Sequence, residues 1–129
     1  MARSRVDPRD LDDGIRDTVM LLWAAGFTTF TSCEGGRGHS FRHETVGLEL
    51  DGAFFDFEKR LVAFLRSQGM QKFTISLMTD YSPDHPEGKR SVYVEGLDLL
   101  SEGKRRRVIE SVHRRERRLR WQLREMGIE

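Results

Sequence analysis

The feature that most restricts the fold is a helical stripe of large apolar side chains between two runs of alternating residues. Within Ala53–Gln68, apolar residues recur every three or four positions, which is typical of a helix with one buried face. The stripe consists of Phe54, Phe57, Leu61, Phe64 and Leu65. The flanking runs Thr45–Leu50 and Lys72–Thr79 alternate apolar and polar residues, which predicts strands with one buried face. Elements of this kind bury their apolar sides against each other, so the sequence predicts a helix packed on a sheet.

The remaining segments extend this pattern to the order α-β-β-α-β-β-α. We expect further helices over Asp10–Ala25 and Gly103–Met126, and further strands over Phe27–Cys33 and Ser91–Leu97. The segment Asp80–Arg90 contains two prolines and is predicted as a loop. The order predicts an α+β two-layer sandwich with a long basic C-terminal helix, and 129 residues suit a single domain with one core. The helix between the second and third strands permits one parallel or crossover pairing.

The composition favours a folded, cytoplasmic protein. Hydrophobic residues make up 37% of the chain and charged residues 33%, with eight Phe and two Trp, which disordered chains lack. No apolar run approaches the roughly 20 residues that span a bilayer, so we expect no membrane contact. The basic N-terminus is followed by Asp10 where a signal peptide needs apolar residues. A single cysteine, Cys33, excludes an internal disulfide.

Residues capable of chemistry concentrate in the loop Ser32–His39, which follows the first predicted strand. Three glycines in four positions let the backbone take positive φ, and successive amides in such a turn can bind an anion. The predicted ligand-binding residues are Ser32, Cys33, Gly35, Gly36, Arg37, Gly38 and His39. The loop lacks the Lys-Ser/Thr of a nucleoside-triphosphate loop and the third glycine of a dinucleotide fingerprint. We expect a phosphate-bearing, nucleotide-like small molecule here; a connection whose glycines only turn the chain is the alternative.

The cysteine and histidines of this region leave two other chemistries open. Cys33, His39 and His43 have the spacing C-x5-H-x3-H and are of the types that bind zinc, although the spacing matches no common zinc signature. The available fourth ligands are Glu34, Asp80, Asp84 and His85. A thiolate pair of Cys33 with His39 or His43, oriented by Asp80 or Asp84, would instead permit nucleophilic catalysis. A buried structural thiol explains the same cysteine, and we predict no metal.

The loop also carries a resemblance to known proteins over roughly Ile15–Leu50. It resembles small bacterial and phage-borne proteins that contain Ser-Cys-x-Gly-Gly-x-Gly-His followed by a Thr-Val strand. The matching positions are Ser32, Cys33, Gly35, Gly36, Gly38, His39, Thr45 and Val46. That resemblance implies a ligand pocket of unknown specificity. More distantly, Thr31–Gly35 is similar to the Ser-Ser-Cys-x-Gly motif of the tRNA wybutosine-synthesizing methyltransferase family, which implies a domain that uses S-adenosylmethionine on tRNA.

The C-terminal segment carries most of the positive charge. Lys104–Glu125 contains ten Lys/Arg and three Glu, about +7, which leaves about −6 on the rest of the chain. Such a helix can contact a phosphate backbone, with an aromatic ring for base stacking. The predicted nucleic-acid contacts are Arg105, Arg106, Arg107, Arg114, Arg118 and Trp121. An RNA-binding protein or RNA-modifying enzyme that combines this helix with the loop is therefore the alternative to a small-ligand domain.

Two further interpretations of this helix stay open. Several Glu and Arg residues lie at helical pair spacing, which also suits an ordinary solvated face. The helix carries a narrow apolar seam through which a homodimer is equally expected. The seam consists of Val108, Val112, Leu119, Leu123 and Met126.

Overall fold

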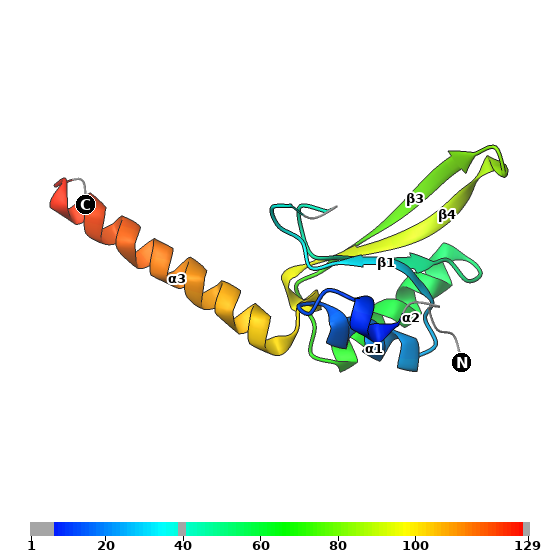
Figure 1. The fold of residues 1–129 in the computed structure, drawn as a ribbon, viewed down its shortest axis with the longest axis horizontal. Helices are drawn as coiled ribbons and strands as arrows, with labels where there is room; N and C mark the ends of the chain where they lie inside the picture. The colour runs from blue at the N-terminus through cyan, green and yellow to red at the C-terminus, as the bar shows by residue number, and fades with distance from the viewer. Residues whose placement is uncertain (1–6, 39–40, 128–129) are drawn as a thin grey trace.

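A computed structural model of the protein describes residues 7–38 and 41–127 and has the α+β fold that the sequence predicts (Figure 1). Its helices and strands, in chain order, are α1 (Arg16–Ala24), β1 (Thr29–Cys33), β2 (Thr45–Glu49), α2 (Phe54–Ser67), β3 (Thr74–Ser82), β4 (His85–Glu95) and α3 (Glu102–Glu125). Short 3-10 turns at Pro8–Asp10 and Leu97–Leu99 precede α1 and α3. The predicted order α-β-β-α-β-β-α is confirmed.

The four strands form one antiparallel sheet in the order β1-β2-β4-β3. Strands β2 and β3 are both antiparallel to β4, so they run in the same direction with β4 between them. The helix α2 joins these two strands. The expected crossover is therefore present, but it skips one strand and produces no parallel pair.

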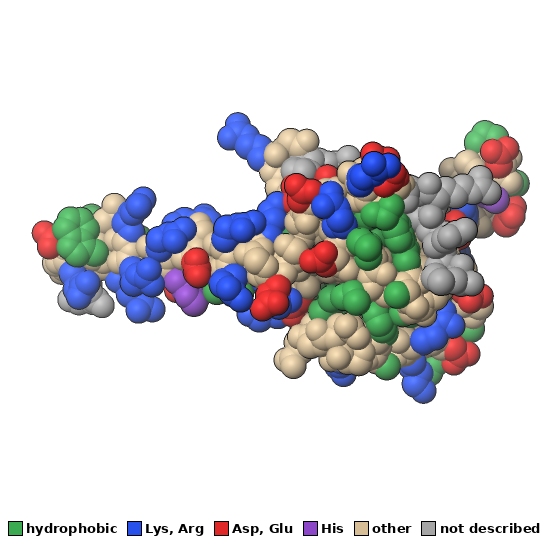
Figure 2. Space-filling model, turned by 60° about the horizontal axis from the view of Figure 1, so that its bottom comes forward, with side chains coloured by type: hydrophobic (Ala, Val, Ile, Leu, Met, Phe, Trp, Pro, Cys, Tyr) green, Lys and Arg blue, Asp and Glu red, His purple; other side chains and the backbone are tan. Residues whose placement is uncertain are grey.

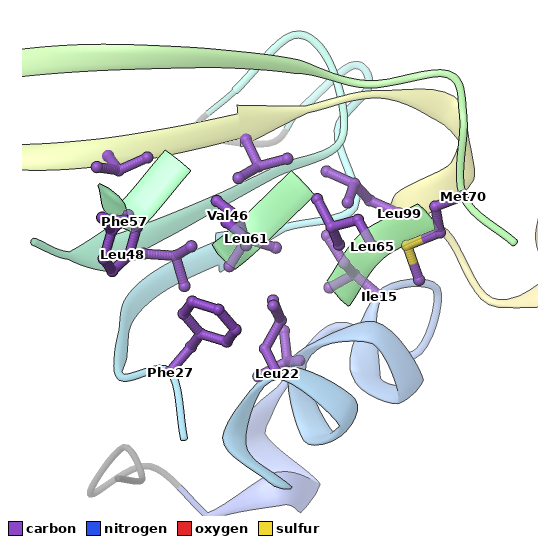
Figure 3. Close-up of a cluster of buried hydrophobic side chains, with 13 residues drawn as sticks. Ile15, Leu22, Phe27, Val46, Leu48, Phe57, Leu61, Leu65, Met70 and Leu99 are labelled. Carbon is purple, nitrogen blue, oxygen red and sulfur yellow. The ribbon is translucent and has the colours of Figure 1, made fainter. Parts of the chain in front are cut away.

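The core lies between one face of the sheet and the helices α1 and α2 (Figures 1 and 3). Val46 of β2 pairs with Val94 of β4, and Leu48 pairs with Val92, so two central strands turn the same apolar pairs inward. The helices contribute fully or almost fully buried residues: Val19, Leu22, Phe57, Leu61 and Leu65. Burying each such side chain contributes about 1.5–3 kcal/mol of hydrophobic free energy, so this layer is a main source of the favourable free energy of folding.

The helix α1 begins at Arg16, not at Asp10 as the apolar spacing predicts. The chain from Pro8 to Asp10 forms a separate short turn, and the amide of Gly14 donates a hydrogen bond to the Glu34 carboxylate at 3.0 Å. If α1 began at Asp10, the Gly14 amide would lie inside the helix, but this amide instead donates to Glu34, which lies outside the segment. The spacing alone does not reveal that contact.

The strands β3 and β4 continue as a hairpin through Asp80–Arg90, so the prediction of a loop there is wrong. Thr79 pairs with Arg90 across the hairpin, and the pairing extends to its tip. Pro83 lies in the turn, and Pro86 lies near the exposed start of β4, where a missing amide donor is tolerated. The hairpin projects beyond the body of the molecule (Figure 1).

The helix α3 projects from the opposite end of the sheet (Figure 1). None of its 24 residues, all within the described part of the chain, is buried. Its first turns contact the body: Lys104 forms an ion pair with Glu34, and Arg105 lies 3.7 Å from the Asp98 carboxylate. Neither α3 nor any other helix among residues 7–38 and 41–127 is long and apolar enough to cross a membrane.

Candidate functional sites

The predicted ligand loop is the connection of the β1–β2 hairpin, and its glycines take the positive φ values that the sequence predicts. Gly35, Gly36 and Gly38 have φ of +78°, +104° and +88°. At Gly35 a Cβ atom would lie 2.4 Å from the carbonyl carbon of His43, so this position requires glycine for space as well as for conformation. A Cβ at Gly38 would meet nothing within 4 Å. The first of these glycines is therefore a structural requirement of the loop.

Three successive amides at the start of the loop are already used within the chain. The N–H groups of residues 34, 35 and 36 each donate a hydrogen bond to an internal acceptor. The acceptors are Asp12 Oδ2 at 3.0 Å, Cys33 Sγ at 3.4 Å and the Arg42 carbonyl oxygen at 3.0 Å. An anion bound by these amides would have to displace all three acceptors, one of which is itself a carboxylate.

The Glu34 side chain fastens the loop to the rest of the molecule. The side chain is only 17% exposed, and its carboxylate accepts hydrogen bonds from the Gly14 amide and from Nζ of Lys104. The loop, the segment before α1 and the first turn of α3 thus meet at one carboxylate. This cluster is one of the contacts that join α3 to the body.

A cavity of about 180 Å³ lies beside β1 and is lined by acidic residues. Its walls are Asp10, Leu11, Asp12 and Thr29–Ser32. The two carboxylates repel a phosphate group at this position. The hollow next to the loop therefore presents two carboxylates and no basic side chain among its described lining residues.

The structure does not assemble the proposed metal or thiolate sites from the residues that it describes. Cys33 is buried, and no group of three or more His, Cys, Asp or Glu among residues 7–38 and 41–127 is arranged to hold a metal ion. Asp84 and His85 lie at the tip of the β3–β4 hairpin, which is far from the loop after β1 (Figure 1), and Asp80 lies on β3, paired with Lys89. His39 of both hypotheses lies outside the described residues. Arg37 is exposed on the loop and Ser32 is half-buried on β1.

A cluster of rings on the open face of the sheet was missed by the sequence analysis. Phe30 contacts Tyr93 edge to face at 5.6 Å between ring centroids, and Phe41 lies 6.1 Å from the same ring. Gly47 makes room for them, because a Cβ there would meet the Phe30 ring at 2.7 Å. Burial raises the pKa of the Tyr93 hydroxyl, and the negative charge of Asp80 raises it further. The signal in the sequence is that Phe30 and Tyr93 are aromatic residues at outward positions of their strands, where polar residues are usual.

The strongest concentration of positive charge follows α3 along its whole length (Figure 2). Four arginines share one side of the helix with Trp121, because they lie three, four or seven residues away from it. They are Arg114, Arg117 and Arg118 before Trp121 and Arg124 after it. Together with Arg107 they form what we call the basic face: Arg107, Arg114, Arg117, Arg118, Trp121 and Arg124. All six residues are exposed, and Trp121 is 56% exposed. An aromatic ring among arginines on a projecting helix is suited to contact a chain of phosphates and bases.

The basic face differs in part from the predicted nucleic-acid contacts. Arg105 lies against Asp98, and Arg106 pairs with Glu102 at 3.2 Å, so these two cations have acidic partners within the chain. Arg117 and Arg124 were missed, although their spacing from Trp121 is visible in the sequence. The face is therefore better defined by its position around the tryptophan than by the run of basic residues at the start of α3.

Comparisons with known protein families, with curated proteins and with solved structures find no match to this chain.

Proposed function

We propose that this protein binds nucleic acid, and RNA in particular, through the basic face of α3. The observation that carries the proposal is the exposed ring of Trp121, surrounded by arginines on a helix that leaves the body of the protein. Of the two functions that the sequence predicts, the geometry supports this one better.

The chemistry of the basic face fits a polyanion. Arginine side chains contact phosphate oxygens, and each neutralised phosphate releases condensed counterions, which favours binding at low salt. An indole ring stacks on any base and contributes about 1–3 kcal/mol per base. Because α3 spans about 36 Å, its arginines can contact several successive phosphates of one strand or duplex.

The small-ligand function has weaker support in the same structure. The loop amides have internal acceptors, and the neighbouring cavity is lined by Asp10 and Asp12. A phosphate-bearing ligand held by Arg37 and the glycine loop stays a prediction, as does the resemblance to the tRNA-modifying family. Native mass spectrometry of the purified protein tests it directly, because a co-purified nucleotide adds mass that is lost on denaturation.

The test of RNA binding is a titration of a fluorescent single-stranded RNA, and of its duplex, at several salt concentrations. We expect the affinity to fall steeply with salt, and the variant R114Q/R117Q/R118Q to bind more weakly with a slope lower by about 2–3. Trp121→Leu should weaken binding of the single strand by roughly 5- to 150-fold and of the duplex much less, because duplex bases are already stacked.

A matched control removes the same charge elsewhere. Arg66, Lys89 and Arg90 are exposed on α2 and the hairpin, and changing all three to glutamine lowers the net charge equally. That control should retain most of the affinity and the salt slope. Equal losses in the two triple variants would show that net charge alone attracts RNA and would overturn the assignment of the basic face.

A further inference from the structure

The strand β3 forms one edge of the sheet and lacks the features that keep sheet edges from pairing with other chains. Natural edge strands are commonly very short, or they carry lysine, proline or a bulge. The other edge strand, β1, has five residues and a bulge between Thr29 and Thr31. In β3 the segment Thr74–Thr79 contains no charged residue and no proline, and its pairing with β4 is regular. The edge at β3 is therefore open to a further strand.

The backbone groups on the free side of β3 can be identified from the neighbouring ladder. Gly96 donates a backbone hydrogen bond to the Glu44 carbonyl oxygen at 3.1 Å, so the even-numbered residues of β4 turn their N–H and C=O groups toward β2. The odd-numbered residues of β4 therefore bond to β3, where Tyr93 pairs with Ser76. It follows that the odd-numbered residues of β3 point their N–H and C=O groups outward. No hydrogen bond among residues 7–38 and 41–127 reaches those outward groups.

We propose that β3 pairs with β3 of a second copy of this chain, antiparallel about a two-fold axis at Ser76, so that the two sheets become one. Ile75 of each copy then exchanges both backbone hydrogen bonds with Leu77 of the other, and Phe73 does so with Thr79. These are the residues whose backbone groups point outward. The proposal does not depend on RNA binding, because it uses no residue of α3.

This register matches side chains on both faces of the sheet. On the face that carries the helices, Ile75 and Leu77 are half-buried at the rim of the core, and each would lie beside the other's counterpart in the second copy. On the open face, Lys72, two residues before β3, lies level with Asp80 of the second copy, and this match occurs twice. Both residues are exposed, and opposite charges across a strand pair attract. Moving the axis by one residue in either direction removes the match of charges.

The geometry of the axis also suits a second copy of the same chain. A two-fold axis that relates two edge strands of one sheet runs perpendicular to the sheet. The helices α1 and α2 of both copies therefore lie on the same face, so the helix layers adjoin as the sheets do. One segment supplies both halves of the interface, which an unrelated extended peptide does not.

The first test is sedimentation velocity of the full chain over a range of protein concentrations. We expect a monomer–dimer equilibrium for the native sequence. Ser76→Lys should raise the dissociation constant roughly tenfold or more, because Ser76 faces its own counterpart at the axis and two like charges would lie directly opposite. Ser76 is exposed, and urea unfolding checks that the variant keeps its fold. Ala24→Lys adds the same charge at an exposed position of α1, which packs beside β1, and should leave the dissociation constant unchanged.

The second test is a disulfide that reports the register. Opposite residues of a non-hydrogen-bonded antiparallel pair have Cα atoms about 4.5 Å apart, which a disulfide can bridge. Under mild oxidation Ser76→Cys should therefore form a cross-linked dimer. Thr74→Cys should form far less, because Thr74 lies level with Met78 of the second copy. The native chain gives the baseline, since its single cysteine, Cys33, is buried.

Two outcomes would overturn the pairing. A native chain that stays monomeric at every concentration, as expected if the edge receives an extended peptide of another protein, is one. Equal cross-linking of Ser76→Cys and Thr74→Cys is the other, because it would indicate random collision. Neither test contains RNA, so a failure here leaves the assignment of the basic face untouched, and the reverse also holds.

Discussion

Gly35 occupies the tightest point of the loop after β1, so substitution there tests how firmly the loop is built. Alanine at this position must take a φ near +78° and would place its Cβ against the backbone at residues 43 and 44. The conformation alone costs about 1–2 kcal/mol, and we expect Gly35→Ala to lower the free energy of unfolding by more than that. Urea unfolding followed by circular dichroism measures the loss.

Gly38 provides the control for this prediction. It has a φ of +88°, but a Cβ there would meet nothing within 4 Å. Gly38→Ala should therefore lose only the conformational part, about 1–2 kcal/mol. If both variants lost the same free energy, the close approach at Gly35 would have no consequence for stability.

Asp98 gives the fold a defined pH dependence. Burial alone would raise the pKa of its carboxyl, but hydrogen bonds from the amides of Gln71 and Lys72, both 2.7 Å, outweigh that effect together with the positive charge of Arg105. The folded pKa is therefore below the ordinary 3.8. The stabilisation is fully present above the unfolded pKa and is lost as the pH falls through the folded pKa.

The measurement is the free energy of unfolding from about pH 6 to about pH 2.5, for the native sequence and for Asp98→Asn. The variant should lose roughly 1.5–3 kcal/mol near neutral pH, and its stability should fall less steeply in acid. Asp84→Asn, at the exposed hairpin tip, is the matched change and should preserve the native profile. Parallel acid profiles for the native chain and Asp98→Asn would contradict the assignment.

At the scale of elements, local spacing predicted most of the helices and strands, and long-range contacts decided the exceptions. The apolar stripe of α2 and the alternation of β2 are visible within their own segments, so no distant contact is needed to predict these elements. The start of α1 depends on Glu34, twenty residues beyond Gly14 in the chain, and no local pattern contains that contact. The β3–β4 hairpin was missed because its prolines suggest a loop, whereas both are compatible with an exposed tip.

For the candidate sites too, local features were predictable from the sequence and long-range contacts were not. The positive φ values of the glycine loop follow from the residue type and were predictable. The use of its first amide by Asp12, which lies twenty-two residues earlier, was not, and that contact changes the expected chemistry of the loop. The basic face was within reach of the sequence, because helical spacing alone places Arg117 and Arg124 beside Trp121.

The projecting part of the β3–β4 hairpin should be dispensable for stability. Residues 78–87 are exposed, as are Lys89 and Arg90, and the core residues of these strands lie nearer the body. Replacing Asp80–Lys89 with Asn-Gly between Thr79 and Arg90, which already pair, makes a tight hairpin turn. We expect the free energy of unfolding to change by less than about 1 kcal/mol in urea unfolding. A loss of several kcal/mol would mean that the arm supports the sheet.

At the scale of the whole molecule, the protein is a small two-layer body with two arms at opposite ends (Figure 1). The body contains the buried apolar cluster, and none of the residues of that cluster comes from α3. Most of the stability of a helix in a protein comes from the packing of one face, and α3 has no buried residue. A polyanion bound on the basic face, as proposed, would supply contacts of this kind.

Truncation after Ser111 tests whether the body folds without the exposed part of α3 and whether RNA binding requires that part. The shortened chain keeps Lys104 and Arg105 with their acidic partners and loses the exposed part of α3, including Leu119 and Trp121. We expect the body to unfold in urea within about 1 kcal/mol of the full chain, measured for both as monomers at low protein concentration. The same protein should show at least tenfold weaker binding of single-stranded RNA. A truncated chain that unfolds would instead make α3 part of the folding unit.

Undiminished RNA binding by a folded truncated chain would show that the body contacts the nucleic acid. The next surface to test would then be the open face of the sheet, with the rings of Phe30, Phe41 and Tyr93.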